Sequence, residues 1–474
     1  MTRQRGLLQR LSENMAGARH RHLLMGAAAL HLALSLVINL AGRFHLLPSL
    51  FDPDGISSAL AFDSFFYRSK AIELVSALAR GHAADWFNAP LPFHVKLYSL
   101  SFAALSPLFG FTMLSVEPLN LLYYLLIVIL IFKIGEEMFD RRTALLASAI
   151  VALWPSFLLH TTQLLRDPLF IFITLSLVLI ITRWLTRELW LRRAMLEALA
   201  GAAASAIVWL TRYNMWTLII CFTIVGGVLL IIRQIREKRW LAGNVAGAAV
   251  LLVTMTSAPT LIGKFLLSDN FIAPGYSAEQ QLRQSGSPCP EETTEGAATI
   301  TQESSLWSRL LANANARVAI LGKHRRRFAQ LYPDAGSNID VCVRLNSVGD
   351  LLSYLPRAAA HGLFAPYPDM WVKSGNSVGL SGRLLSGMET LGMYLIELLA
   401  IAGLWTGRRL LPVWFIVLVA IVGIIAGGLV VVNVAVLFRI RYVFSMLLII
   451  LGAGGAMRFL SPPVPRRSGA GEQG

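Results

Sequence analysis

The chain has little charge for its length. Only 15% of its 474 residues are Asp, Glu, Lys or Arg, whereas 55% are hydrophobic and the mean hydropathy is +0.60. A soluble protein of this size carries about a quarter charged residues. The shortage of charge therefore excludes an ordinary soluble fold and predicts an all-α polytopic membrane protein.

Cysteine is also scarce, and the three cysteines do not have the spacing of a zinc site. Cys221 lies in an apolar run, which predicts a small buried hydrophobic residue. Cys289 and Cys342 lie in one long polar segment, where an oxidising compartment would favour a disulfide between them. The sequence has no evident internal repeat, which disfavours an inverted-repeat transporter.

Acidic residues are outnumbered by basic ones, 27 against 42, which gives a formal net charge of +15. In a soluble protein this excess would indicate a nucleic-acid partner. In a membrane protein, Lys and Arg collect in cytoplasmic connections, and little basic surface remains for nucleic acid. The distribution of basic residues therefore predicts how the chain is oriented in the membrane, and it does not indicate a nucleic-acid partner.

Apolar runs of about 17–25 residues predict ten membrane-spanning helices. They lie at 23–42, 117–135, 143–162, 168–186, 195–211, 216–232, 241–262, 387–405, 410–432 and 442–457. The run 93–112 contains Lys96 and is predicted as a juxtamembrane or re-entrant helix. Counting it as an eleventh span would place most of the later arginine clusters on the outer side, against the positive-inside rule.

This arrangement predicts three parts, with both termini in the cytoplasm. The N-terminal membrane module is 1–262 and includes a first outer segment at 43–116. An outer loop domain follows at 263–386. The last transmembrane helices and a cytoplasmic tail make up 387–474.

Arginine dominates the short outer connections. The basic residues predicted there or in the first outer segment are Arg166, Arg212, Arg439, Arg441 and Lys96. Each one alone can be explained as a side chain that reaches the membrane interface. Together they predict a site for a shared anionic ligand, because a guanidinium group donates two aligned hydrogen bonds to a phosphate.

Asp63 begins a predicted helix of the first outer segment. The apolar face of this helix comprises Phe66, Ile72, Leu74 and Leu78. An Asp at the start of a helix is commonly an N-cap. The alternative is a carboxylate that takes a proton from an acceptor hydroxyl group.

Asp52 and Asp54 flank a proline and precede a glycine, which is a strong turn signal. Paired acids of this kind can also bind a divalent cation through oxygen ligands. We therefore keep both as secondary acid candidates and leave the metal open.

A basic cluster lies in the predicted outer loop domain. It comprises Lys323, Arg325, Arg326 and Arg327, with His324 between the first two. One interpretation is a solvated helix face. The other is contact with lipid phosphate headgroups or an acidic glycan.

A series of short patterns runs through the chain. In order they are Asp63, Tyr67, Ala71, Gly81, Pro90-Leu91-Pro92, Leu108-Phe109-Gly110, Phe139-Asp140-Arg141-Arg142-Thr143-Ala144, Trp154-Pro155, Asp167 and Arg441-Tyr442. The series resembles the GT-C glycosyltransferases and is most similar to the protein O-mannosyltransferase and aminoarabinose-transferase branch. It covers roughly residues 50–190 and 438–457. It departs from the family at Asp63-Ser64, where the family has Asp-Glu.

The resemblance implies a GT-C-like fold in the bacterial inner (plasma) membrane, with the active site on the extracytoplasmic face. It implies transfer of a sugar from a polyprenyl-phosphate carrier to a glycan, lipid or protein acceptor. Asp63 would be the base, and Asp167 a second acid that orients the acceptor or holds a divalent cation. The four outer arginines would bind the carrier phosphate as it leaves.

Two other functions remain as alternatives. One is a polymerase or ligase that uses glycans on a lipid diphosphate. The other is a transporter or flippase of lipid-linked sugars, which would place ionisable residues near the middle of the spans. The predicted spans are nearly free of charge there, so the sequence favours a transferase.

Overall fold

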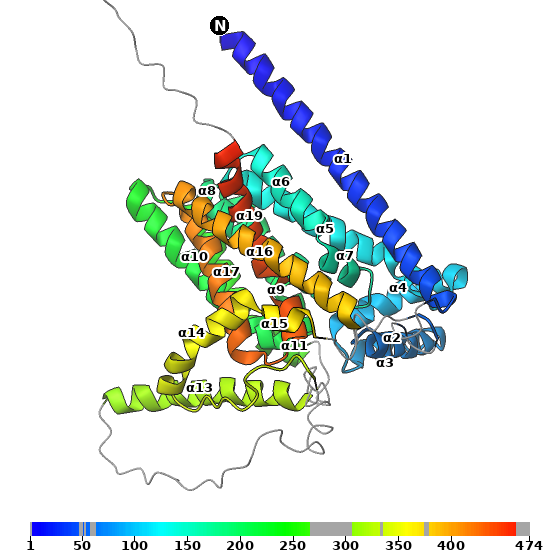
Figure 1. Cartoon of the computed structure of the whole chain (residues 1–474). Helices are drawn as coiled ribbons and strands as arrows, with labels where there is room; N and C mark the ends of the chain where they lie inside the picture. The colour runs from blue at the N-terminus through cyan, green and yellow to red at the C-terminus, as the bar shows by residue number, and fades with distance from the viewer. Residues whose placement is uncertain are drawn as a thin grey trace, which may run out of the picture.

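A computed structural model describes residues 2–46, 51, 54–56, 63–265, 306–331, 335–373 and 379–460. Regular structure in these residues is helical, apart from isolated bridge residues such as the pair Asn338 and Asn433 (Figure 1). The helices are α1 (Thr2–Arg43), α2 (Asp63–Ala79), α3 (Ala83–Asn88), α4 (Phe93–Phe109), η3 (Met113–Ser115), α5 (Glu117–Met138), α6 (Arg141–Ala152), α7 (Pro155–Thr161), α8 (Asp167–Thr186), α9 (Leu191–Arg212), η4 (Tyr213–Met215), α10 (Trp216–Glu237), α11 (Ala242–Phe265), α13 (Leu306–Leu331), α14 (Val348–Phe364), α15 (Pro368–Trp371), α16 (Gly379–Gly407), α17 (Leu411–Val430), α18 (Val434–Ile440) and α19 (Tyr442–Leu460).

Among the described residues, eight helical stretches are long and apolar enough to cross a membrane. The number rises to nine if α6 and α7, which are bent by 63° at their junction, form one span. The predicted all-α polytopic fold is confirmed, but the count of ten is not. The stretch Leu191–Glu237 contains both α9 and α10 and so includes two of the predicted spans. The helix α4 is not among the eight stretches.

The most enclosed spans are α8 and α19. Of their apolar windows, 72% and 78% is buried inside the protein. Their first residues, Asp167 and Tyr442, are consequently held near the centre of one end of the bundle. This end also carries α2 to α4 and the crosswise helix α13 (Figure 1).

Glycine allows α16 and α19 to pack closely. A Cβ atom added at Gly403 of α16 would lie 2.0 Å from the carbonyl oxygen of Leu451, and one added at Gly455 of α19 would lie 2.0 Å from that of Leu399. Without a hydrophobic driving force between helices in lipid, such close contact of small residues is a main source of association.

We expect Gly403→Val to destabilise the protein by about 1–3 kcal/mol, because the added side chain must push two backbones apart. Gly392→Val is the matched control on the same helix, since a Cβ atom at Gly392 meets nothing within 4 Å. Thermal unfolding of both variants in detergent checks this prediction. Equal midpoints for the two variants would contradict the close packing.

The helices α2 and α4 form a small apolar core outside the main bundle. Tyr67, Ala71 and Leu74 of α2 pack on Tyr98 and Phe102 of α4. These helices are the juxtamembrane part predicted in the first outer segment. Their packing fixes the start of α2, where Asp63 lies.

The described part of the predicted outer loop domain rests on the end of α17. Arg325 of α13 is 1% exposed and donates hydrogen bonds to the carbonyl oxygens of Leu429, at 2.9 Å, and Asp340, at 2.8 Å. The prediction that Arg325 contacts lipid headgroups is therefore wrong. Its guanidinium group instead donates hydrogen bonds to carbonyl groups that lack partners at the end of α17. Lys323 and Arg326 are exposed, and Arg327 is half-buried.

A second polar network in this domain centres on Asp340. Its carboxylate accepts hydrogen bonds from Arg357 at 2.5 and 2.8 Å and from His361 at 2.7 Å. Burial raises the pKa of Asp340, but the bonds from Arg357 and His361 outweigh it and lower that pKa to about 2. The backbone beside Asp340 also pairs with the chain that leads into α18, since the Ile339 amide donates to the carbonyl oxygen of Val432.

We expect Asp340 to make stability depend on acid pH. Because the pKa of the folded protein lies below the value of about 3.9 in an unfolded chain, the stabilisation is present above pH 4 and is lost as the pH falls towards 2. The unfolding midpoint of Asp340→Asn should thus lie below that of the wild type at pH 5 and approach it at pH 2.5. A difference that stays constant over this range would contradict the assignment.

The cysteines divide into two kinds. Cys342 is disulfide-bonded, whereas its predicted partner Cys289 lies outside the described residues. Cys221 is free and exposed on α10. The prediction that Cys221 is buried is therefore wrong, because an apolar position in a membrane span can face lipid as well as the protein core.

Candidate active site

Two carboxylates and two guanidinium groups meet at one end of the bundle. Arg439 donates to Asp63 at 2.9 Å and lies 3.9 Å from the nearer oxygen of Asp167. Arg212 donates to the other oxygen of Asp167 at 2.5 Å. Residues predicted as separate candidates thus form one cluster that joins positions far apart in the chain.

Local structure explains how these side chains are positioned. Asp167 and Pro168 begin α8, where a carboxylate is favoured by the helix dipole and a proline replaces an amide that would lack a partner. Arg212 is the last residue of α9. Arg439 lies on the short helix α18, which is capped by the Asn433 side chain.

Arg166 completes the cluster from the position before α8. It lies close enough to Tyr67, Asp63 and Asp167 for their charges and dipoles to affect it. Its Nε atom and the Nη1 atom of Arg212 are buried donors without a hydrogen-bond partner among the described residues. Buried donors of this kind are rare in proteins and mark a place where a ligand can accept hydrogen bonds.

The cluster has a formal excess of one positive charge. Its three guanidinium groups belong to Arg166, Arg212 and Arg439, and its two carboxylates to Asp63 and Asp167. In a site of low dielectric constant, this excess favours an anion. A phosphate suits the planar donors of arginine.

Exposure separates the two acids. The side chain of Asp63 is 21% exposed, whereas that of Asp167 is only 4% exposed. Asp63 is therefore accessible to a substrate hydroxyl group. Asp167 is enclosed between two arginines and holds them in place.

Sequence reasoning missed a hydrogen-bonded group beside this cluster. The hydroxyl group of Tyr442 donates to Ser156 at 2.8 Å and lies 3.0 Å from Nδ1 of His160. The Ser156 amide in turn donates to Glu389 at 2.6 Å. His160 is close enough to Asp167 to interact with its charge. The arginine-tyrosine pair at the start of α19 was the only sequence signal for this group.

Tyr67 and His94 form a second layer behind Arg166. Their rings make an edge-to-face contact with centroids 4.5 Å apart. Burial raises the pKa of Tyr67 and lowers the pKa of His94 well below its ordinary value, so both side chains are neutral at pH 7. Both nitrogen atoms of the His94 ring are buried and lack a hydrogen-bond partner among the described residues.

Two residues predicted to bind the donor phosphate have other partners. Lys96 donates to the carbonyl oxygen of Phe87 at 2.5 Å, which ties α4 to α3. Arg441 donates to the carbonyl oxygens of Gly362, at 3.2 Å, and Leu363, at 3.1 Å, near the end of α14. Burial lowers the pKa of Arg441 to about 10, so it remains charged at neutral pH. The structure therefore places both side chains outside the Asp63 cluster.

The remaining acid candidates do not join the cluster either. Asp54 is largely exposed and lies 3.5 Å from Arg68, whereas Asp52 lies outside the described residues. Among the residues that the structure describes, no three His, Cys, Asp or Glu side chains are grouped as ligands for a metal ion.

Residues 96–262 match the family described as dolichyl-phosphate-mannose-protein mannosyltransferase. The match confirms the resemblance to GT-C glycosyltransferases that the sequence predicted. The matched range contains Arg166, Asp167 and Arg212, but not Asp63 or Arg439.

Comparison with curated protein sequences gives no match. Among solved structures, one match is the crystal structure of ArnT from Cupriavidus metallidurans bound to undecaprenyl phosphate. The two chains are 15% identical, and the alignment covers 91% of this chain and 78% of that one, with a TM-score of 0.36.

Proposed function

We propose that this protein is an integral-membrane glycosyltransferase that moves a sugar from a polyprenyl-phosphate carrier to an acceptor hydroxyl group. The observation that carries the proposal is the cluster of Asp63 and Asp167 with three arginines. It offers an accessible carboxylate beside buried phosphate donors. The family matched by residues 96–262 is named for a sugar on a lipid phosphate, which is a donor of the same class.

In the proposed reaction, the acceptor oxygen forms a bond to the anomeric carbon while the bond from that carbon to the phosphate oxygen breaks. Asp63 takes the proton of the acceptor hydroxyl group while the hydroxyl oxygen bonds to the anomeric carbon. The electron pair of the broken bond stays on the phosphate oxygen, so the phosphate becomes more negatively charged. Attack from the face opposite the phosphate inverts the anomeric centre.

The arginines act on the leaving group. Arg166 and Arg212 have donors available for the phosphate oxygens, and these donors are fixed before the reaction begins. Donors arranged in advance stabilise a developing charge more than mobile water does. Asp167 is assigned a positioning role, because it is buried and bonded to Arg212.

Mass spectrometry of lipid-linked and surface glycans, with and without the protein, tests the proposed function. We expect one glycan to lose a single sugar unit when the protein is absent. A missing ladder of repeat units would instead support the polymerase alternative. Identical glycan profiles, with expression of the protein verified, would contradict both.

A further inference from the structure

A second basic site lies at the end of the bundle opposite Asp63. There, the C-terminal ends of α5, α8 and α10 meet the start of α17 around a cavity of about 480 Å³. The α8 helix has 20 residues and links the two sites, which places them about 30 Å apart at 1.5 Å per residue. The cavity therefore belongs to the other membrane face.

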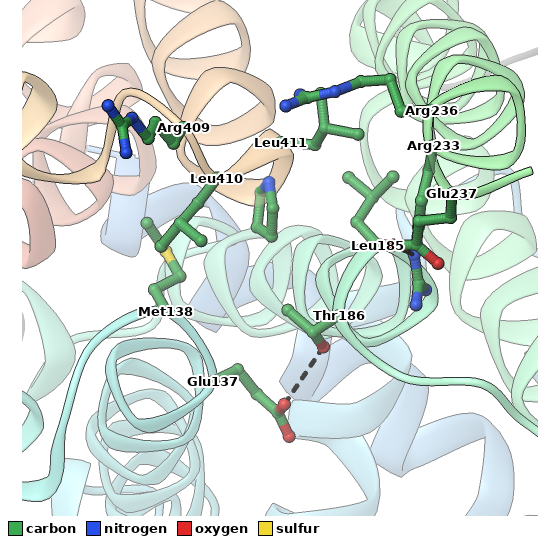
Figure 2. A pocket seen from close by; sticks show the side chains of 11 residues that line it. Glu137, Met138, Leu185, Thr186, Arg233, Arg236, Glu237, Arg409, Leu410 and Leu411 are labelled. Carbon is green, nitrogen blue, oxygen red and sulfur yellow. Dashed lines mark hydrogen bonds and ion pairs between the residues drawn. The ribbon is translucent and has the colours of Figure 1, made fainter.

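Two arginines on one rim of this cavity have charges that no described residue neutralises. Arg236 and Arg409 are exposed and have no ion pair among the described residues. Figure 2 shows both on the side opposite Glu137 and Thr186. They are contributed by α10 and by the connection before α17, so a single anion between them would join two elements.

The other charges that line the cavity are already paired. Glu137 accepts hydrogen bonds from Arg187 at 2.9 Å and from Thr186 at 3.3 Å. Arg233 donates to Glu237 at 2.8 Å and to the carbonyl oxygens of two residues at the end of α8. The lining consequently has a net positive charge at Arg236 and Arg409 only.

Exposed tryptophans mark the level of this cavity relative to a bilayer. They are Trp190, Trp240, Trp405 and Trp414, which are 40–89% exposed. All four lie at or next to helix ends on this face of the bundle. Because tryptophan is enriched at the interface between lipid tails and water, the cavity opens at the level of the lipid headgroups.

The rest of the lining is apolar. Met138, Leu185, Leu410, Leu411 and Pro412 complete the lining. A ligand with a charged end and an apolar body fits such a lining. The volume lies within the range of about 300–1,000 Å³ for small-molecule pockets.

We propose that this cavity binds the phosphate headgroup of an acidic phospholipid, with Arg236 and Arg409 as its phosphate ligands. Basic cavities between membrane helices at this level are sites for acidic lipid headgroups. The lipid would bridge α10 and α17 and stabilise the helix ends at this face. The proposal is independent of the proposed sugar transfer.

Thermal unfolding of the purified full-length protein in detergent tests the site. We expect dioctanoyl phosphatidylglycerol to raise the midpoint in a saturable manner, and zwitterionic dioctanoyl phosphatidylcholine to have a much smaller effect. Arg236→Gln with Arg409→Gln should raise the half-saturating concentration by about tenfold or more, which corresponds to the loss of one charged hydrogen bond. Arg142→Gln with Arg192→Gln is the matched control, because both arginines are exposed at the same end but do not line the cavity.

Three outcomes would overturn the proposal. The control variant would lose as much affinity as the cavity variant if the lipid responded only to overall surface charge. Inorganic phosphate would give the same stabilisation as the lipid if the site took free anions. Phosphatidylglycerol would not raise the wild-type midpoint if the cavity did not bind it.

Discussion

Asp63→Asn is expected to lower sugar transfer by about 10²–10⁴-fold while leaving the folded protein intact. A general base that is positioned next to the reacting group raises the reaction rate by about this factor. The asparagine oxygen can still accept the hydrogen bond that Arg439 donates to Asp63 at 2.9 Å. The side chains of Asp63 and Arg439 are both partly exposed, so water can help to solvate the Arg439 charge when the Asp63 charge is removed. Release of polyprenyl phosphate from the lipid-linked sugar gives the rate.

Asp54→Asn provides the matched control for this experiment. Asp54 is a neighbouring acid in the segment before α2, but its carboxylate is largely exposed and paired with Arg68. We expect its activity to stay within about twofold of the wild type, since a surface ion pair contributes little. If Asp63→Asn is fully active, or if Asp54→Asn loses as much activity, Asp63 is not the base.

The second large effect concerns the buried pair of Arg212 and Asp167. Arg212→Met should destabilise the protein by about 3–5 kcal/mol, because it leaves the carboxylate of Asp167 buried without its main partner. The side chains of this pair are only 7% and 4% exposed. Arg192→Met on the same helix is exposed and should be close to neutral. Thermal unfolding in detergent and the yield of monodisperse protein measure the difference.

A double variant separates the structural role from the functional one. Arg212→Met combined with Asp167→Leu removes both charges, and replacement of a buried pair by apolar residues is often neutral in stability. We expect most of the lost stability to return, whereas transfer stays abolished because a phosphate donor is missing. A double variant that is no more stable than Arg212→Met, or one that is active, would refute this division of roles.

Charge distribution made much of the candidate site predictable from sequence. Arg166, Asp167, Arg212 and Arg439 are charged residues next to long apolar runs, and the structure brings them together with Asp63. Charged residues are costly near the membrane interior and are therefore few, so each one is a candidate for the functional site. The all-α polytopic class follows from the same shortage of charge.

Sequence could not distinguish arginines that serve the fold from those of the site. Arg325 and Arg441 both donate to backbone carbonyl groups, which are partners that every sequence offers at every position. The face of α2 was also misjudged. Phe66 is 54% exposed, whereas Tyr67 and Ala71 are buried against α4. Of the predicted face, Leu74 is buried in the same contact, so the packing against α4 selects Tyr67 in place of Phe66.

A structure of the protein with bound polyprenyl phosphate tests the central claim most directly. We expect the phosphate to lie within hydrogen-bonding distance of Arg166 and Arg212, with Asp63 facing the adjacent space for the acceptor. A bound polyprenyl phosphate whose phosphate group lies away from Arg166 and Arg212 would contradict the assignment of this cluster as the donor site.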